Sequence, residues 1–125
     1  MSEQKGSYKT ALTAVTSTAA GGALSLQNPE GVDLIITDLV LDITTPATGA
    51  ATVDAGMSGA SVATSDNLID AGNVGAAAIV LSNGSEGGTN GKGARRWPSG
   101  EYLTITASAT LLGLVGNAYV RWIRA

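Results

Sequence analysis

The stretch SNGSEGGTNGKGARRWPSG, residues 82–100, is the part of this chain that most resembles a functional site. It is rich in glycine and holds three cations and a tryptophan. Gly91-Lys92 matches the end of the phosphate-binding pattern G-x-x-x-x-G-K-[ST]. Glu86, however, stands where that pattern needs its first glycine, and Gly93 stands where it needs a hydroxyl. The spacing excludes a P-loop, so the stretch is either a connection between strands or a surface for a partner.

Other catalytic and metal-binding chemistries are restricted by composition. The chain has no cysteine and no histidine, which excludes thiolate sites, histidine triads and histidine-ligated zinc. Asp66, Asn67 and Asp70 offer oxygens that could bind Ca²⁺, but the EF-hand spacing is absent. Solvated surface carboxylates are the favoured interpretation. We therefore expect no enzyme, no cofactor and no metal site.

Charge is distributed unevenly along the chain. The net charge is −3, and no lysine or arginine occurs between Thr10 and Gly91, where eight acidic residues lie. We expect this segregation to give the folded chain an acidic and a basic region, which would orient it against a partner. A small basic patch is expected around Arg95 and Arg96. The isoelectric point of about 4.6 disfavours nucleic acid and favours a protein or carbohydrate partner.

The hydrophobic pattern indicates strands and almost no helix. Residues 32–45 alternate between apolar and polar side chains, and the phase changes near Thr37 and Asp38, which predicts a β-bulge there. Similar patterns occupy the ranges 10–16, 22–27, 50–57, 76–82, 101–109 and 117–125. About seven or eight short strands separated by turn residues predict an all-β, antiparallel sandwich or barrel.

The chain of 125 residues is long enough for one domain with its own core, and 44% of it is hydrophobic. We expect a single β-sandwich domain over residues 10–125, preceded by a flexible N-terminal arm over residues 1–9. The arm is polar and does not resemble a secretory signal. No apolar stretch is long enough to span a membrane. We expect a soluble protein that is made in a cytoplasm and has no membrane partner.

Residues 32–125 resemble small jelly-roll proteins of tailed bacteriophages, namely head decoration (cement) and head-fibre proteins. The resemblance is carried by TSDNLIDAG, by W-x-x-G-E-Y-L-T-I from Trp97, and by G-L-V-G-N-A-Y-V from Gly113. It implies a jelly-roll sandwich, a homotrimer, binding to the major capsid protein on the capsid exterior, and synthesis in a bacterial host. The alternative is a carbohydrate-binding or adhesion module displayed on a virion or fibre.

The residues expected to contact the capsid or another subunit are cations and aromatic residues outside the acidic middle of the chain. Arginine and tryptophan are enriched in the energetically dominant parts of protein interfaces. For Trp97 the alternative is that it closes one end of the sandwich. The full set is Lys5, Tyr8, Lys9, Lys92, Arg95, Arg96 and Trp97.

Overall fold

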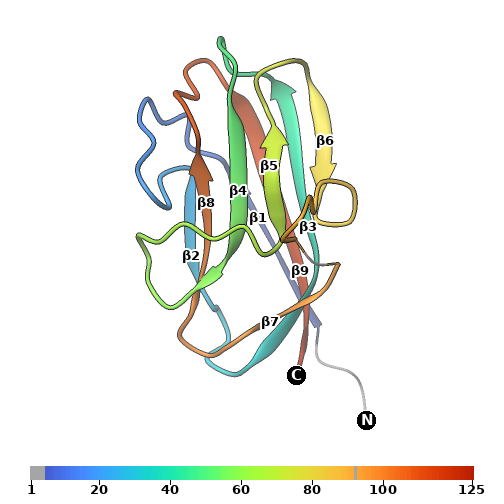
Figure 1. Ribbon diagram of the computed structural model, residues 1–125. Helices are drawn as coiled ribbons and strands as arrows, with labels where there is room; N and C mark the ends of the chain where they lie inside the picture. Colours follow the sequence, from blue (N-terminus) through green and yellow to red (C-terminus); the bar gives the residue numbers. More distant parts are fainter. Residues whose placement is uncertain (1–4, 92) are drawn as a thin grey trace.

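Two antiparallel sheets pack face to face in the computed structural model, which describes residues 5–91 and 93–125 (Figure 1). We call them sheet A, with the order β1-β9-β3-β6 and β7 also pairing with β3, and sheet B, with the order β2-β8-β4-β5. The described residues form nine strands, which are β1 (Lys5–Ala11), β2 (Leu24–Gln27), β3 (Leu34–Thr45), β4 (Thr52–Ser58), β5 (Ile69–Asn73), β6 (Ile79–Ser82), β7 (Arg95–Trp97), β8 (Tyr102–Ala107) and β9 (Val115–Arg124).

The long strands β3 and β9 form the centre of sheet A and supply much of the core. Their apolar side chains alternate toward sheet B, as the period of two in their sequences requires. The register between them shifts between Ile36 and Asp38, so the predicted bulge is confirmed. The bulge explains the change of phase, because it keeps both Ile36 and Leu39 pointing into the core.

The expected boundary between arm and domain at residue 9 is wrong. Strand β1 begins at Lys5 and pairs with β9 from Lys5↔Ile123 to Ala11↔Asn117. The polar side chains of this segment suggested an arm, but an edge strand can be held by its backbone hydrogen bonds alone. Residues 1–4 lie outside the described part of the chain.

Two short strands, β5 and β7, were not expected from the sequence, because glycine and polar residues surround both. β7 is three residues long and pairs with the beginning of β3, in the register Leu34↔Trp97 to Ile36↔Arg95.

The residues that the structure describes include no helix able to cross a membrane.

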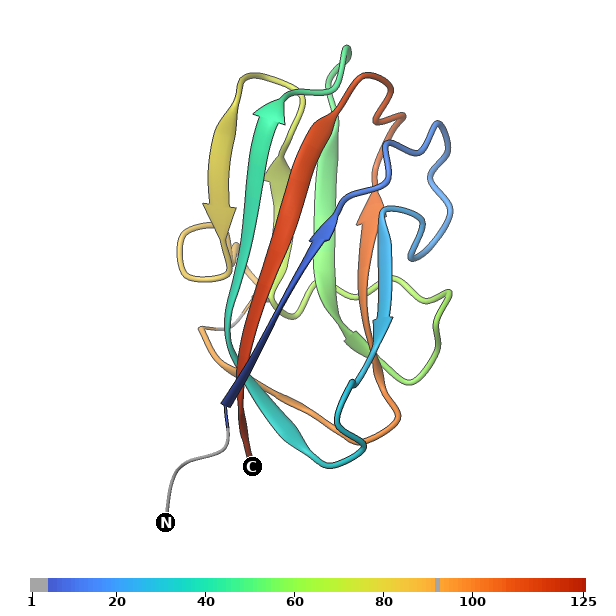
Figure 2. The same cartoon turned by 180° about the vertical axis from the view of Figure 1, so that it is seen from behind.

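The outer faces of the two sheets differ. The connection 59–68 crosses the outer face of sheet B, where Asn67 accepts a hydrogen bond from Met57 N (3.0 Å) and Ser25 Oγ donates to Ser61 O (2.9 Å). Thr104, on that face, is fully buried beneath it. None of the described connections crosses the outer face of sheet A, which faces the viewer in Figure 2. Sheet A is therefore the sheet that presents its strands to solvent.

Candidate interaction surfaces

Trp97 fixes β7 to the body of the sandwich. Its side chain is fully buried, and its Nε1 donates a hydrogen bond to Glu101 O at 3.0 Å. Its ring meets that of Trp122 edge to face, with 6.1 Å between the ring centroids. The structure thus places Trp97 in the core, which agrees with the alternative that it closes one end of the sandwich and corrects its assignment to a contact surface.

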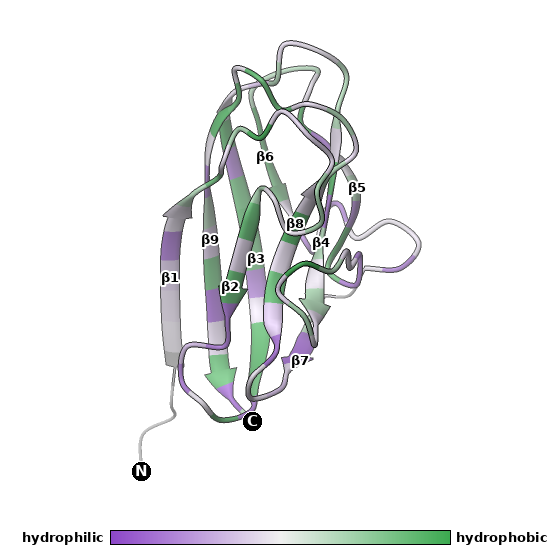
Figure 3. Cartoon of the chain, turned by 90° about the vertical axis from the view of Figure 1, so that its left-hand side faces the viewer, coloured by the Kyte–Doolittle hydropathy of each residue, from purple (hydrophilic) through white to green (hydrophobic). Residues whose placement is uncertain are grey.

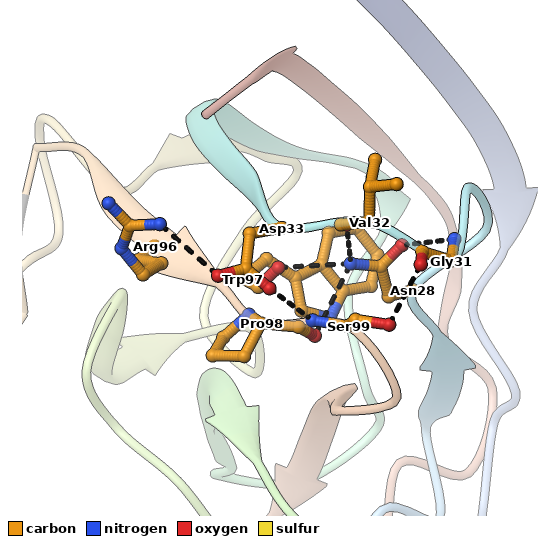
Figure 4. A network of polar contacts seen from close by, with 8 residues as sticks. All are labelled: Asn28, Gly31, Val32, Asp33, Arg96, Trp97, Pro98 and Ser99. Atoms are coloured by element: carbon orange, nitrogen blue, oxygen red, sulfur yellow. Dashed lines mark hydrogen bonds and ion pairs between the residues drawn. The ribbon is translucent and has the colours of Figure 1, made fainter.

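A polar network holds the ends of β7 and β3 together (Figure 4). Asn28 is buried, and its Nδ2 donates to Val32 O at 2.8 Å and to Trp97 O at 2.9 Å. One carboxylate oxygen of Asp33 accepts from Ser99 N at 2.9 Å, and the other pairs with Arg96 at 3.3 Å. The network therefore orients Arg96, one of the two arginines of β7, through Asp33.

A depression of about 500 Å³ lies beside β7, and we call it the β7 pocket. Arg95 and Arg96 border it and are both exposed, while Met57 and Pro98 give it an apolar wall. A guanidinium beside apolar surface can bind a carboxylate through two parallel hydrogen bonds while its stem packs. The complete lining is Met57, Asn67, Ala94, Arg95, Arg96, Pro98 and Glu101.

A second, larger depression of about 580 Å³ lies on the outer face of sheet A, and we call it the sheet A groove. It holds charges of both signs, with Lys9 and Arg121 on β1 and β9 and the two acids on β3. The Lys9 ammonium lies 5.5 Å from the centroid of the Tyr119 ring, and Arg121 pairs with Asp38 at 3.1 Å. The complete lining is Ser7, Tyr8, Lys9, Asp38, Val40, Asp42, Val80, Tyr119, Val120 and Arg121.

The candidate residues are thus not gathered into one site. Tyr8, which is 44% exposed, and Lys9 line the sheet A groove, whereas Arg95 and Arg96 line the β7 pocket. Lys5 is the first residue of β1 and lies opposite Ile123. Lys92 lies outside the described residues.

The expected separation into an acidic and a basic region does not survive folding. Three cations that follow Gly91 in the sequence form ion pairs with acids that precede it: Arg96 with Asp33, Arg121 with Asp38, and Arg124 with Glu30. Antiparallel pairing of β9 and β7 with β3 brings these segments together. The charge pattern of the sequence therefore becomes local pairing.

Glu30 is the acid with the most distinctive surroundings. Its carboxylate accepts a hydrogen bond from Trp122 Nε1 and another from Arg124 Nε at 2.9 Å. These two hydrogen bonds stabilise the charged form and hold the pKa of Glu30 below its ordinary value of 4.5. Glu30 therefore links the loop before β3 to the end of β9.

Two of the acids considered as Ca²⁺ ligands, Asp66 and Asp70, accept hydrogen bonds from a loop. Asp66 accepts a hydrogen bond from Asn90 Nδ2 at 2.9 Å, and Asp70 accepts one from Asn90 N at 3.3 Å. Among the described residues, no three acidic, histidine or cysteine side chains are grouped as metal ligands. The two carboxylates thus tether the connection between β6 and β7 to sheet B.

Sequence reasoning missed most of the sheet A groove. Asp38, Val40 and Asp42 lie on alternate positions of β3, and Tyr119 and Arg121 do so on β9. The alternation of side chains along each strand was visible in the sequence, but the pairing of the two strands was not.

Comparisons of the chain with models of known protein families, with curated proteins and with solved structures found no match.

Proposed function

We propose that this protein is a structural virion protein that binds the outer surface of a tailed-phage capsid, as a homotrimer, and stabilises it. The resemblance of residues 32–125 to decoration proteins supports this proposal, with the major capsid protein as partner. We further propose that the chain is not an enzyme. Virion attachment needs a rigid body with a contact surface, and a sandwich whose loops are tied by hydrogen bonds meets that need.

The observation that carries the proposal is the β7 pocket. It combines two exposed arginines with the apolar Met57 and Pro98, and the buried Trp97 holds its strand in place. Arginines next to desolvated apolar surface are typical of the residues that dominate protein–protein binding. An acidic side chain of a capsid protein is the chemical partner that such a pocket fits best.

The order of the strands supports a jelly-roll topology within the proposal. If the short β7 is left aside, sheet A has the strand order β1-β9-β3-β6 and sheet B has the order β2-β8-β4-β5. Consecutive strands β1 to β6 therefore mostly alternate between the two sheets, as in two interleaved Greek keys.

The test is co-sedimentation with undecorated capsids of the phage whose genome encodes the chain. We expect the double variant R95A/R96A to fold like the parent, because surface substitutions change stability by about ±0.5 kcal/mol. Capsid binding should weaken by about 2 kcal/mol or more for each arginine that becomes buried against an acid.

The matched control is the double variant D66N/D70N. It should loosen the tether of the loop to sheet B and leave capsid binding largely intact, since neither carboxylate lines the β7 pocket. If R95A/R96A decorates capsids as well as the parent, β7 is only a connection. A gene neighbourhood without a major capsid protein would count against the virion assignment itself.

The sheet A groove favours the alternative, a carbohydrate-binding module. Tyr8 and Tyr119 provide aromatic surface, and Asp38 and Asp42 provide acceptors for sugar hydroxyls. A glycan array probed with the parent and with Tyr119→Ala tests it. Binding of the parent to glycans on the array, and loss of that binding in the variant, would favour this function. A parent that binds no glycan would count against it.

A further inference from the structure

One end of the sandwich carries no charged residue. Four connections meet there: residues 12–23 between β1 and β2, 46–51 between β3 and β4, 74–78 between β5 and β6, and 108–114 between β8 and β9. Figures 1 and 2 show these connections in the upper part of the molecule. We call them together the uncharged end.

The opposite end holds charges in all of its connections. Glu30, Asp33, Asp66, Glu86 and Glu101 lie in the connections there, and Arg95 and Arg96 lie in β7 beside them. About a quarter of the residues of a typical soluble domain are charged, and most of them lie on the surface. An end of the molecule that is exposed to solvent and has no charged residue therefore differs from an ordinary protein surface.

The uncharged end is extensive and apolar in part. Leu112 and Val115 are each 56% exposed, and residues 76–78 form a run of exposed alanines leading to Ile79, which is 41% exposed. Figure 3 shows the chain at this end mainly in white and green. The exposed residues of this surface, with Thr44, Thr45, Ile79 and Val115 added from the adjoining strands, are Thr13, Ala14, Thr16, Ser17, Thr18, Ala19, Thr44, Thr45, Thr48, Gly49, Ala50, Ala76, Ala77, Ala78, Ile79, Ser108, Thr110, Leu112, Gly113 and Val115.

The surface is also held in one arrangement. Backbone hydrogen bonds join the connections to each other: Thr48 N donates to Leu112 O (2.9 Å), Ala47 N to Val74 O (3.0 Å) and Leu111 N to Val15 O (2.7 Å). A side chain at Gly75 would collide with the backbone of Gly49 and Ala51, so two of the connections are in direct contact. Binding through this end would thus require little ordering.

We propose that the uncharged end is the surface through which copies of this chain associate with one another. Its exposed residues are about as many as one side of a standard protein interface, which has roughly 20 to 30. Depletion of charge is what distinguishes the centre of such interfaces from other surfaces. Small side chains, mostly alanine, threonine, serine and glycine, allow two backbones to approach closely.

The absence of charge selects a second copy over a different partner. In a ring of copies around a symmetry axis, equivalent residues that lie near the axis come close to one another, so a charge there faces its own equivalents. Like charges placed opposite each other are strongly unfavourable. A surface that meets its own copies avoids this repulsion by carrying no charge, whereas a surface for a different protein can use complementary charges, as the β7 pocket does.

The experiment places charges on the uncharged end and measures self-association by sedimentation velocity. The variant A77E/L112E adds two carboxylates to different connections at exposed positions. The control A60E/V62E makes the matched change in the connection 59–68, where Ala60 and Val62 are also exposed. We expect A77E/L112E to weaken association by at least about tenfold and the control to associate like the parent. Melting temperatures of all three proteins establish that each is folded.

This inference rests on the proposed self-association and is independent of capsid binding, so the outcomes can be separated. A parent that stays monomeric at high micromolar concentration would overturn both the homotrimer and this surface. A parent that associates while A77E/L112E associates equally well would overturn the surface alone. Neither outcome bears on co-sedimentation of R95A/R96A with capsids, because those arginines lie at the opposite end.

Discussion

Single side-chain contacts join segments that lie far apart in the sequence. Trp97 packs on Trp122, Arg124 pairs with Glu30, and Arg96 pairs with Asp33. An exposed pair such as Arg96 with Asp33 contributes little to stability, because water screens it. The buried tryptophan has a much larger effect, since it removes a large apolar surface from water.

Trp97 gives the most direct test at the scale of a residue. Replacing a buried tryptophan by alanine leaves a cavity and costs roughly 3–5 kcal/mol of unfolding free energy. We expect W97A to lose that amount and W97F to lose less, because phenylalanine fills part of the space. Urea unfolding followed by far-ultraviolet circular dichroism measures both. The exposed Val62→Ala is the control, and equal stabilities of W97A and V62A would contradict the burial of Trp97.

Glu30 gives a prediction about pH. Its pKa lies below 4.5 in the folded chain because Trp122 and Arg124 donate hydrogen bonds to it. Its stabilising contribution is therefore present above the pKa of the unfolded chain and is lost as pH falls through the lowered, folded value. We expect E30Q to melt below the parent at neutral pH, with the difference shrinking on acidification below about pH 4.5. The control is E86Q, and a difference for E30Q that is constant with pH would exclude this role.

The elements show which parts of the fold can be predicted from sequence. The alternation in residues 32–45 and 117–125 predicted β3, β9 and the bulge, because side-chain direction in a strand is a local property. The pairing of β1 with β9 and of β7 with β3 joins segments far apart in the sequence, so no local pattern reports it. For the same reason the types of the site residues were predictable, but their division between two depressions was not.

Strand β1 provides the test at the scale of an element. Gly6 lies opposite Trp122, and any side chain at Gly6 would overlap the indole ring. We expect G6A to unpair the beginning of β1 and to increase hydrogen exchange of the backbone amides between Gly6 and Ala11. The control G59A adds the same methyl group where no atom lies within 4 Å. Equal exchange in G6A and G59A would show that β1 does not depend on this contact.

The whole molecule has two ends of different chemistry. The β7 pocket lies among charged connections, and the opposite end carries none. Contacts between charged groups weaken as salt shortens the range of electrostatic forces, whereas contacts between uncharged groups do not. The two proposed interfaces therefore differ in a property that can be measured without any substitution.

Raising the salt concentration from about 0.1 M to about 1 M shortens the screening length from about 10 Å to about 3 Å. We expect capsid binding through Arg95 and Arg96 to weaken over this range, with the association rate changing most. Self-association through the uncharged end should stay constant or strengthen, most clearly in sulfate, which favours burial of apolar surface. Sedimentation velocity and capsid co-sedimentation in the same buffers measure the two quantities. Self-association that falls with salt in parallel with capsid binding would mean that charged groups hold the copies together, and would rule out the uncharged end as the contact between them.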